Sequence, residues 1–165
     1  MPLPLETERL RLRPAKEEDL ETWLAISRDA EQEWWGEPHS TIDDARENLD
    51  KHLRSQERHG FSLWPVELRR TGEVIGLTGL QHLAGGAEIE VGYRFLRHHW
   101  GEGYATEAAR AAIGFAFDEL GLDRIVAVTL PTNERSRHVL EKCGLSLVGV
   151  THVYGRAHVK YALSR

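Results

Sequence analysis

The sequence has one cysteine, an excess of acidic over basic residues, and no long hydrophobic run. Cys143 cannot form an internal disulfide, and near the end of a predicted helix it is expected to be a small buried residue rather than a nucleophile. Lysine and arginine total 21 against 26 aspartate and glutamate residues, a formal net charge of −5, which argues against a broad basic surface for nucleic acid. No apolar run approaches the roughly 18 residues that span a bilayer, and the first residues lack the features of a signal peptide. We therefore expect a cytoplasmic protein that binds neither nucleic acid nor membranes.

Length and composition are those of an ordinary globular domain. Hydrophobic residues make up 41% and charged residues 28% of the 165 positions, enough to bury a core without disulfides or a structural metal. We expect one domain over residues 1–165. The nine histidines show no helical metal-ligand spacing, and the adjacent His98 and His99 would need further ligands to share an ion, so no metal is expected.

Periodicity predicts an α/β (α+β) fold. Alternating or β-branched runs predict strands at residues 7–13, 61–68, 73–80, 87–96, 124–130, 145–150 and 159–163. Apolar spacings of three and four predict helices at residues 17–24, 41–60, 104–120 and 134–142. A strand, a long helix and a strand in succession imply a parallel pair with a right-handed crossover. Pro65 cannot donate to a ladder, so we expect it at a bulge or an edge.

A glycine-containing turn connects a predicted strand to the long helix. Its residues are Trp100, Gly101, Glu102, Gly103, Tyr104, Ala105 and Thr106. Glycines allow close backbone approach, and the first-turn amides face outward, so the turn suits an anion such as a pyrophosphate. A P-loop is excluded because no lysine occurs between Lys51 and Lys142, and a dinucleotide fingerprint fits poorly because Thr106 occupies the third glycine position. The alternative, a tight turn that binds no ligand, remains open.

The same string resembles the acyl-CoA motif of GNAT acetyltransferases, Gln/Arg-x-x-Gly-x-Gly/Ala. Trp100, Gly103 and Ala105 occupy its first, fourth and sixth positions. The Trp-Gly-x-Gly-Tyr-Ala-Thr-Glu string is similar to the RimJ/RimL branch of ribosomal-protein N-terminal acetyltransferases, and residues 7–14, 74–76 and 133–145 resemble further blocks of that branch. The resemblance implies the GNAT fold: a mostly antiparallel sheet of about six to seven strands, splayed at a central parallel pair and flanked by about four helices.

The resemblance also implies a cosubstrate, acetyl-CoA, and the residues that bind it. The pantetheine arm is expected in the gap between the parallel strands, against the backbone of Phe95 and Leu96, with the pyrophosphate on the amides of residues 100–106. Asn133 matches a residue whose amide side chain touches the cofactor arm. From the sequence alone, this asparagine is equally a turn former or a helix cap.

For catalysis, the resemblance implies direct attack of an amine on the thioester in a ternary complex. Glu90 matches the glutamate before Gly-Tyr in this branch and is the candidate base. Ser136 is the candidate acid for the departing thiolate, and a backbone amide near Phe95 is the candidate oxyanion donor. The alternatives are a solvated strand face for Glu90 and a helix cap for Ser136.

The acceptor remains open between a peptide N-terminal α-amine and a small amine. An α-amine titrates about two to three units below a lysine and needs only a modest base. The candidate substrate-binding residues are Trp34, Trp35, Glu88, Tyr154 and Arg156. The paired tryptophans could instead anchor the core.

Two other functions and the oligomeric state stay open. One is a non-catalytic acyl-CoA sensor. The other is an enzyme for another acyl group such as succinyl, whose extra carboxylate would need Arg97 or a neighbouring arginine. Monomer and homodimer are both compatible with the sequence.

Overall fold

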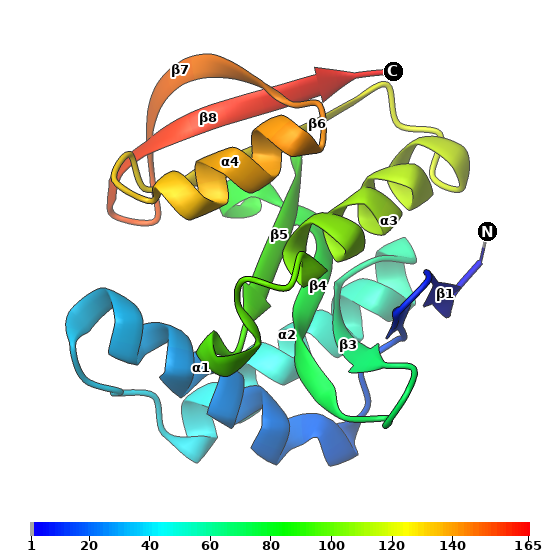
Figure 1. Cartoon of the computed structure of the whole chain (residues 1–165), viewed down its shortest axis with the longest axis vertical. Coiled ribbons are helices and arrows are strands. Elements are labelled where there is room, and N and C mark those ends of the chain that lie inside the picture. The colour runs from blue at the N-terminus through cyan, green and yellow to red at the C-terminus, as the bar shows by residue number, and fades with distance from the viewer. Residues whose placement is uncertain (1) are drawn as a thin grey trace.

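The computed structural model describes residues 2–165, which form one open sheet with helices on both faces (Figure 1). The strands are β1 (Leu5–Glu6), β2 (Leu10–Leu12), β3 (Leu63–Leu68), β4 (Val74–His82), β5 (Ile89–Phe95), β6 (Arg124–Thr129), β7 (Ser146–Val153) and β8 (Arg156–Ser164). The helices are α1 (Leu20–Trp35), α2 (Ile42–His59), α3 (Tyr104–Asp118) and α4 (Glu134–Lys142). Short 3-10 turns are η1 (Glu17–Asp19), η2 (Leu83–Gly85) and η3 (Arg97–His99). None of these helices is long and apolar enough to cross a membrane.

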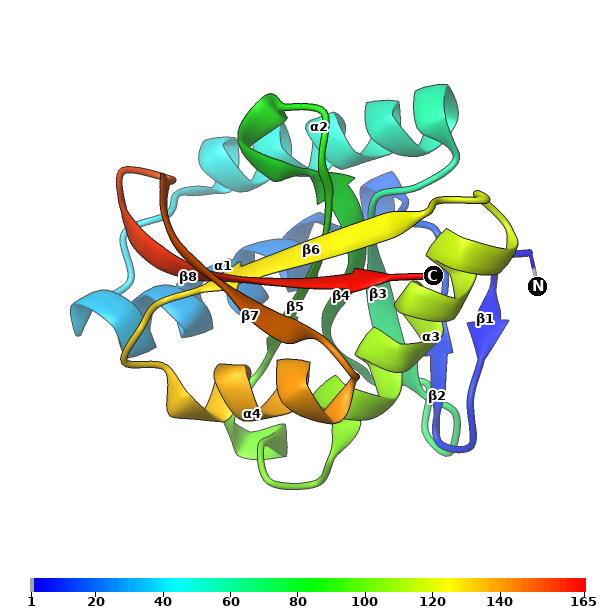
Figure 2. The same ribbon diagram turned by 90° about the horizontal axis from the view of Figure 1, so that it is seen from above.

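The sheet has the order β1-β2-β3-β4-β5-β6-β8-β7, and only β5 and β6 pair in parallel. Their register consists of a single pair, Glu90 opposite Val126, whereas the antiparallel β4 and β5 pair along seven positions. The two strands therefore separate toward the carboxyl end of β5. Figure 2 shows β6 and β8 crossing the direction of β3 and β4. The expected splayed parallel pair is confirmed.

The helices cover the sheet in two layers, with α2 on one side and α3 and α4 on the other in Figure 2. Alanines make the close packing of α3 possible, because Ala108, Ala109, Ala112 and Ala116 are all fully buried in the main core. A second cluster lies on the α1 and α2 side, where Trp23 packs with residues of α2, β3 and β4.

The structure has eight strands in place of the expected six to seven, and its first helix is longer than predicted. Strand β1 has two residues, too few for an alternating pattern. Helix α1 continues to Trp35 and ends where Gly36 adopts a left-handed φ of 77°. Trp34 and Trp35, which lie beyond the predicted helix end at residue 24, therefore form the last turn of α1.

Pro65 lies in β3, which has β2 on one side and β4 on the other. Its carbonyl accepts a hydrogen bond from the Arg13 amide at 3.2 Å, so the proline nitrogen, on the same side of the strand, faces chain beyond the end of β2. The bulge occurs one residue later, between Val66 and Glu67. Pro65 thus costs no ladder bond, although its strand is internal.

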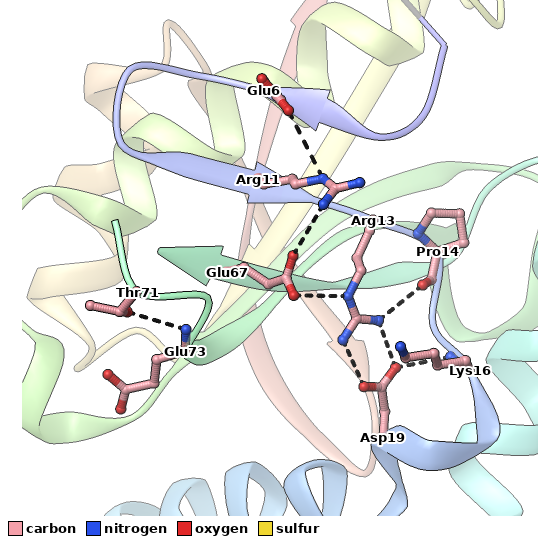
Figure 3. Close-up of polar contacts among 9 residues, drawn as sticks. All are labelled: Glu6, Arg11, Arg13, Pro14, Lys16, Asp19, Glu67, Thr71 and Glu73. Atoms are coloured by element: carbon pink, nitrogen blue, oxygen red, sulfur yellow. Dashed lines mark hydrogen bonds and ion pairs between the residues drawn. The ribbon is translucent and has the colours of Figure 1, made fainter. Parts of the chain in front are cut away.

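An ion-pair network at the end of β2 attaches the start of α1 to the sheet (Figure 3). The Arg13 guanidinium donates two hydrogen bonds to Asp19 at 2.8 Å each, and its Nε lies 3.2 Å from Glu67 of β3. Asp19 also accepts from the Lys16 amide at 2.9 Å. Arg13 and Asp19 are 15% and 8% exposed, so the pair is largely removed from solvent.

Candidate active site

A cavity of about 1050 Å³ opens where β5 and β6 separate. It reaches the first turn of α3, the start of α4, helices α1 and α2, and the turn between β7 and β8. Of the residues singled out in the sequence, it is lined by Trp34, Trp35, Glu90, Phe95, Trp100, Gly101, Gly103, Tyr104, Ala105, Thr106, Asn133, Ser136, Tyr154 and Arg156. Glu88, Leu96 and Glu102 are not part of its wall. We call the lining residues within 99–106 and 129–136 its glycine side, and Glu31, Glu90, Arg94, Tyr154 and His158 its carboxylate side.

On the glycine side, backbone groups form an anion site at the start of α3. Gly101 and Gly103 have φ values of 85° and 83°, a left-handed conformation that favours glycine. Gly103 is the N-cap, and no side chain caps the helix. The amides of Tyr104, Ala105 and Thr106 therefore lack helical partners and face the cavity at the positive end of the helix dipole.

Arg9 holds this turn from outside the cavity. Its guanidinium donates to the Glu102 carbonyl at 2.8 Å and to Glu107 Oε1 at 2.7 Å, and it lies 4.5 Å from the centre of the Tyr104 ring. Although burial opposes ionisation, hydrogen bonds from Thr7 and Arg9 lower the pKa of Glu107. The sequence analysis places Arg9 only within the predicted strand at residues 7–13. Its contact with Glu102, 93 positions away in the sequence, could not be read from a local pattern.

The edge of β5 presents different backbone groups at Phe95 and Leu96. The Leu96 amide donates to the Ile75 carbonyl at 3.0 Å, and its carbonyl accepts from the His99 amide at 2.9 Å. Because successive residues of a strand point their backbone groups to opposite sides, Phe95 faces the gap toward β6, where its carbonyl accepts from Trp100 Nε1 at 2.8 Å. Both backbone groups of Leu96 are thus bonded within the protein, which leaves Phe95 as the better candidate.

At the start of α4, Asn133 and Ser136 are joined. Asn133 Oδ1 accepts from the Ser136 amide at 3.1 Å, so Asn133 is the N-cap and Ser136 is not. This bond occupies only the oxygen of the Asn133 amide. Its NH2 group can still donate to a ligand.

Ser136 also contacts a residue that the sequence analysis missed. The Tyr93 hydroxyl lies 2.8 Å from Ser136 Oγ and 3.1 Å from the Ser136 carbonyl. Burial raises the pKa of Tyr93, so its hydroxyl stays protonated at neutral pH. Two neighbouring hydroxyl groups therefore line the cavity on this side.

Glu90 is the most unusual side chain of the carboxylate side. It is only 4% exposed, which excludes the solvated strand face. Oε1 accepts from Gln81 at 2.6 Å and from Tyr154 at 3.0 Å, whereas Oε2 is buried with no hydrogen-bond partner among residues 2–165. Burial raises the pKa of Glu90, although the two hydrogen bonds act in the opposite direction. A buried carboxylate with one free oxygen and a raised pKa is suited to accept a proton.

Glu31, in the same cavity, has the opposite environment. It accepts from the amide and hydroxyl of Ser40 at 3.0 and 2.6 Å, and its Oε2 lies 2.9 Å from His39 Nε2. Burial would raise its pKa, but the hydrogen bonds from Ser40 and His39 lower it below the usual value. Glu31 is thus saturated and anchors the loop between α1 and α2.

The predicted substrate residues fall in different places. Trp34 and Trp35 are 39% and 58% exposed and line the cavity, so they are not core anchors, unlike Trp23 and Trp64. Glu88 is paired outside the cavity wall, 3.0 Å from Arg124 and 2.5 Å from Lys160.

The turn between β7 and β8 brings Tyr154 and Arg156 into the cavity wall. Tyr154 has a left-handed φ of 53°, and its hydroxyl reaches from this turn to Glu90.

The described residues also bring Glu73 close to His98 and His99, with one ligand atom of each within 4.8 Å of the others. Glu73 and His98 are exposed, and this group lies beside η3.

Comparison with known proteins gives consistent matches. Residues 9–146 match the family model described as acetyltransferase (GNAT) domain. The chain is 35% identical over 154 residues to the Bacillus subtilis uncharacterized N-acetyltransferase YoaA, covering 91% of this chain and 86% of that one. It is 28% identical over 142 residues to spermidine N(1)-acetyltransferase of Escherichia coli K12, covering 85% and 74%. Mycobacterium smegmatis RimJ, solved in complex with CoA-disulfide, superposes with a TM-score of 0.75 at 27% identity, covering 94% of this chain and 81% of that one.

Proposed function

Since the chain belongs to the GNAT family and is an N-acetyltransferase, we propose that it transfers the acetyl group of acetyl-CoA to an amine by direct attack in a ternary complex. The observation that carries this proposal is the presence, in one cavity, of a backbone anion site and a buried glutamate with a free oxygen. The first suits a pyrophosphate and the second suits the proton of an amine.

The residues present fit CoA. The unpaired amides of Tyr104, Ala105 and Thr106 would hold its pyrophosphate, and the gap-facing backbone of Phe95 would meet the pantetheine arm. The Asn133 amide would donate to the same arm. When bound, acetyl-CoA supplies a thioester whose carbonyl carbon is open to attack by an amine.

Glu90 accepts the proton of the amine in this proposal. The amine nitrogen forms the new C–N bond as the C–S bond breaks, the nitrogen proton passes to Glu90, and the sulfur leaves with the bonding electrons. Because burial raises the pKa of Glu90, it is a stronger base than an exposed carboxylate. Its hydrogen bonds from Gln81 and Tyr154 fix the carboxylate and leave Oε2 for the amine.

The leaving sulfur needs a proton, and we assign its delivery to the Tyr93 and Ser136 hydroxyl pair. Either hydroxyl can donate in their 2.8 Å hydrogen bond. Ser136→Ala and Tyr93→Phe separate their roles. If Ser136 is the acid, its variant should lose about 10²-fold or more in kcat while Tyr93→Phe loses less.

The acceptor class includes peptide N-termini and small amines. The similarity to RimJ favours the first, and the similarity to spermidine N(1)-acetyltransferase favours the second. Thiol release from acetyl-CoA across short peptides, small amines and aminoglycosides distinguishes them. Tight acetyl-CoA binding without release from any acceptor would favour a sensor, and faster turnover of succinyl-CoA would favour another acyl group.

Glu90→Gln tests the proposal. We expect kcat to fall by about 10²- to 10³-fold with acetyl-CoA affinity unchanged, because the base is lost and the anion site is intact. In the wild type, kcat/KM should rise with pH as Glu90 ionises, and this limb should disappear in the variant. Glu57→Gln, an exposed glutamate of α2 outside the cavity wall, is the matched control and should retain wild-type kinetics. An unchanged pH profile in Glu90→Gln would remove Glu90 as the base.

A further inference from the structure

Arg94 lines the same cavity and lies on the same face of β5 as Glu90. Alternate residues of a strand share a face, so Glu90, Gly92 and Arg94 face the α1 and α2 side, whereas Tyr93 reaches Ser136 on the α4 side. At about 3.3 Å per strand residue, the four steps from Glu90 to Arg94 separate their Cα atoms by about 13 Å, and the two side chains extend from the same face of β5.

The Arg94 guanidinium has no hydrogen bond or ion pair within the part of the chain that the structure describes. Two arginines close to the cavity, Arg97 and Arg135, are already engaged. Arg97 lies 3.4 Å from Glu33, and Arg135 stacks 4.5 Å above the Trp100 ring. The Arg94 side chain is exposed and lines the cavity.

The acidic groups near Arg94 do not neutralise it. Glu31, Glu90 and Tyr154 interact with it only at a distance. Glu31 is saturated by Ser40 and His39, and Glu90 is held by Gln81 and Tyr154. A guanidinium that lines a cavity without a partner is free to bind an anion there, and its planar fork matches a carboxylate.

Space for that anion exists beside Gly92. Gly92 lines the cavity between Glu90 and Arg94, and a Cβ there would approach Leu63 Cδ2 at 3.6 Å. Without a side chain at this position, the face of β5 between the base and the guanidinium is open. A molecule bound to both groups would lie along this face and span the space between the two side chains.

We propose that Arg94 binds a carboxylate of the acceptor, so that the preferred acceptors are amines that also carry a carboxylate, such as free amino acids. This inference rests on the proposed function, with the acceptor amine at Glu90. An extended polyamine, which is cationic at both ends, is disfavoured because Arg94 repels its second charge.

The same guanidinium could meet a carboxylate from the acyl donor, as in succinyl-CoA. Its position favours the acceptor. Arg94 shares a face with the base, whereas the gap toward β6 is met by the backbone of Phe95. The experiment below separates the two sources.

The test compares each amino acid with its amide, which keeps the amine and removes the charge. For glycine, β-alanine and phenylalanine against their amides, we expect wild-type kcat/KM to favour the carboxylate about 10- to 100-fold with acetyl-CoA, after correction for amine ionisation. In Arg94→Gln the ratio should fall to near one, and Arg94→Lys should retain part of it. Arg97→Gln, outside the cavity wall, should leave the ratio unchanged. A wild-type ratio near one, or a ratio that survives Arg94→Gln, would overturn the inference.

Two further measurements keep its failure distinct from failure of the proposed function. Calorimetry of each acid and amide with the CoA-bound protein reports recognition without turnover, and here too the acid should bind more tightly through Arg94. Absence of turnover with every amine would contradict the proposed function, while equal binding of acid and amide would contradict only the role of Arg94. Preference for succinyl-CoA over acetyl-CoA that is lost in Arg94→Gln would assign the guanidinium to the donor and overturn the acceptor assignment.

Discussion

The two sides of the cavity recognise ligands by different means. The glycine side uses backbone amides at the start of α3, presented by two left-handed glycines within one contiguous segment. The carboxylate side uses side chains from α1, β5 and the β7–β8 turn, which are far apart in the sequence. Backbone recognition suits a constant ligand such as the pyrophosphate, while side chains can change and select the acceptor.

Each side also depends on support from outside the cavity. Arg9 holds the glycine side through Glu102 and Glu107. The carboxylate side depends on α1, which carries Glu31 and is attached to the sheet by the Arg13 and Asp19 pair. The comparison therefore predicts that separate substitutions weaken donor binding, acceptor binding or the ion pair that attaches α1 to the sheet.

We expect the largest effect on the free energy of unfolding at the ion pair between Arg13 and Asp19. Arg13→Ala leaves the largely buried Asp19 carboxylate without its partner, and we expect the free energy of unfolding to fall by about 3 kcal/mol. Burial would raise the pKa of Asp19, but the hydrogen bonds from Arg13 and the Lys16 amide lower it overall. This contribution is present above the unfolded-state pKa and is lost as pH falls through the lower folded-state pKa.

Urea unfolding of wild type and Arg13→Ala from neutral to acidic pH measures both effects. The difference in stability should shrink as the pH falls. Arg11→Ala, whose exposed guanidinium approaches Glu6 and Glu67 only at 4.0 Å, is the control and should cost little. An equal loss at all pH values would show that the Asp19 carboxylate is not the group involved.

Gly103→Val should give the largest loss on the glycine side. Its φ of 83° is strained for a branched residue, and the added Cβ would lie 3.4 Å from the Arg9 guanidinium. We expect the Kd for acetyl-CoA to rise about 100-fold, equivalent to about 2.7 kcal/mol. Gly60→Val has a similar φ of 79° at the end of α2 with open space around it. It should lose comparable stability while retaining acetyl-CoA affinity by calorimetry, and a shared loss of affinity would contradict the site.

Arg9→Ala should have a smaller effect on the same side. The turn keeps its sequence but loses its external support, and we expect the Kd for acetyl-CoA to rise about tenfold with little change in kcat at saturation. Arg9→Lys should recover only part of the affinity, because one ammonium cannot bond both Glu102 and Glu107 as the guanidinium does. A fall in kcat alone would contradict a positioning role in donor binding.

Much of the fold could be predicted from local pattern. Helix α3 was predicted to within two residues at its end because its alanine repeat is regular and Gly121 follows it. The end of α1 was missed: the predicted helix stops at residue 24, before the mostly polar second half of the helix, whereas α1 continues to Trp35 and ends at the left-handed Gly36.

The site was predictable to the extent that it is contiguous. The segment from Trp100 to Thr106 carries its own geometry. The sequence offers both Glu88 and Glu90 as site candidates, but only the structure shows that Glu90 is buried while Glu88 pairs with Lys160. Tyr93 and Arg94 were overlooked for the same reason, since a strand pattern gives two faces and does not say what covers each one.

We expect the smallest effect at the hydrogen bond between Tyr154 and Glu90, which connects two distant regions of the sequence on the carboxylate side. Tyr154, from the β7–β8 turn, donates to Glu90 on β5 at 3.0 Å, and this hydrogen bond lowers the pKa of Glu90 against the effect of burial. Tyr154→Phe removes it, so the pKa of Glu90 should rise further. A base must be deprotonated to act, and the acidic limb of kcat/KM should therefore move to higher pH while the rate on the alkaline plateau stays within a few-fold of wild type. In a Glu90→Gln background the same substitution should leave the pH profile unchanged, because the group that Tyr154 tunes is absent; a shift that persists there would mean that the limb belongs to another residue.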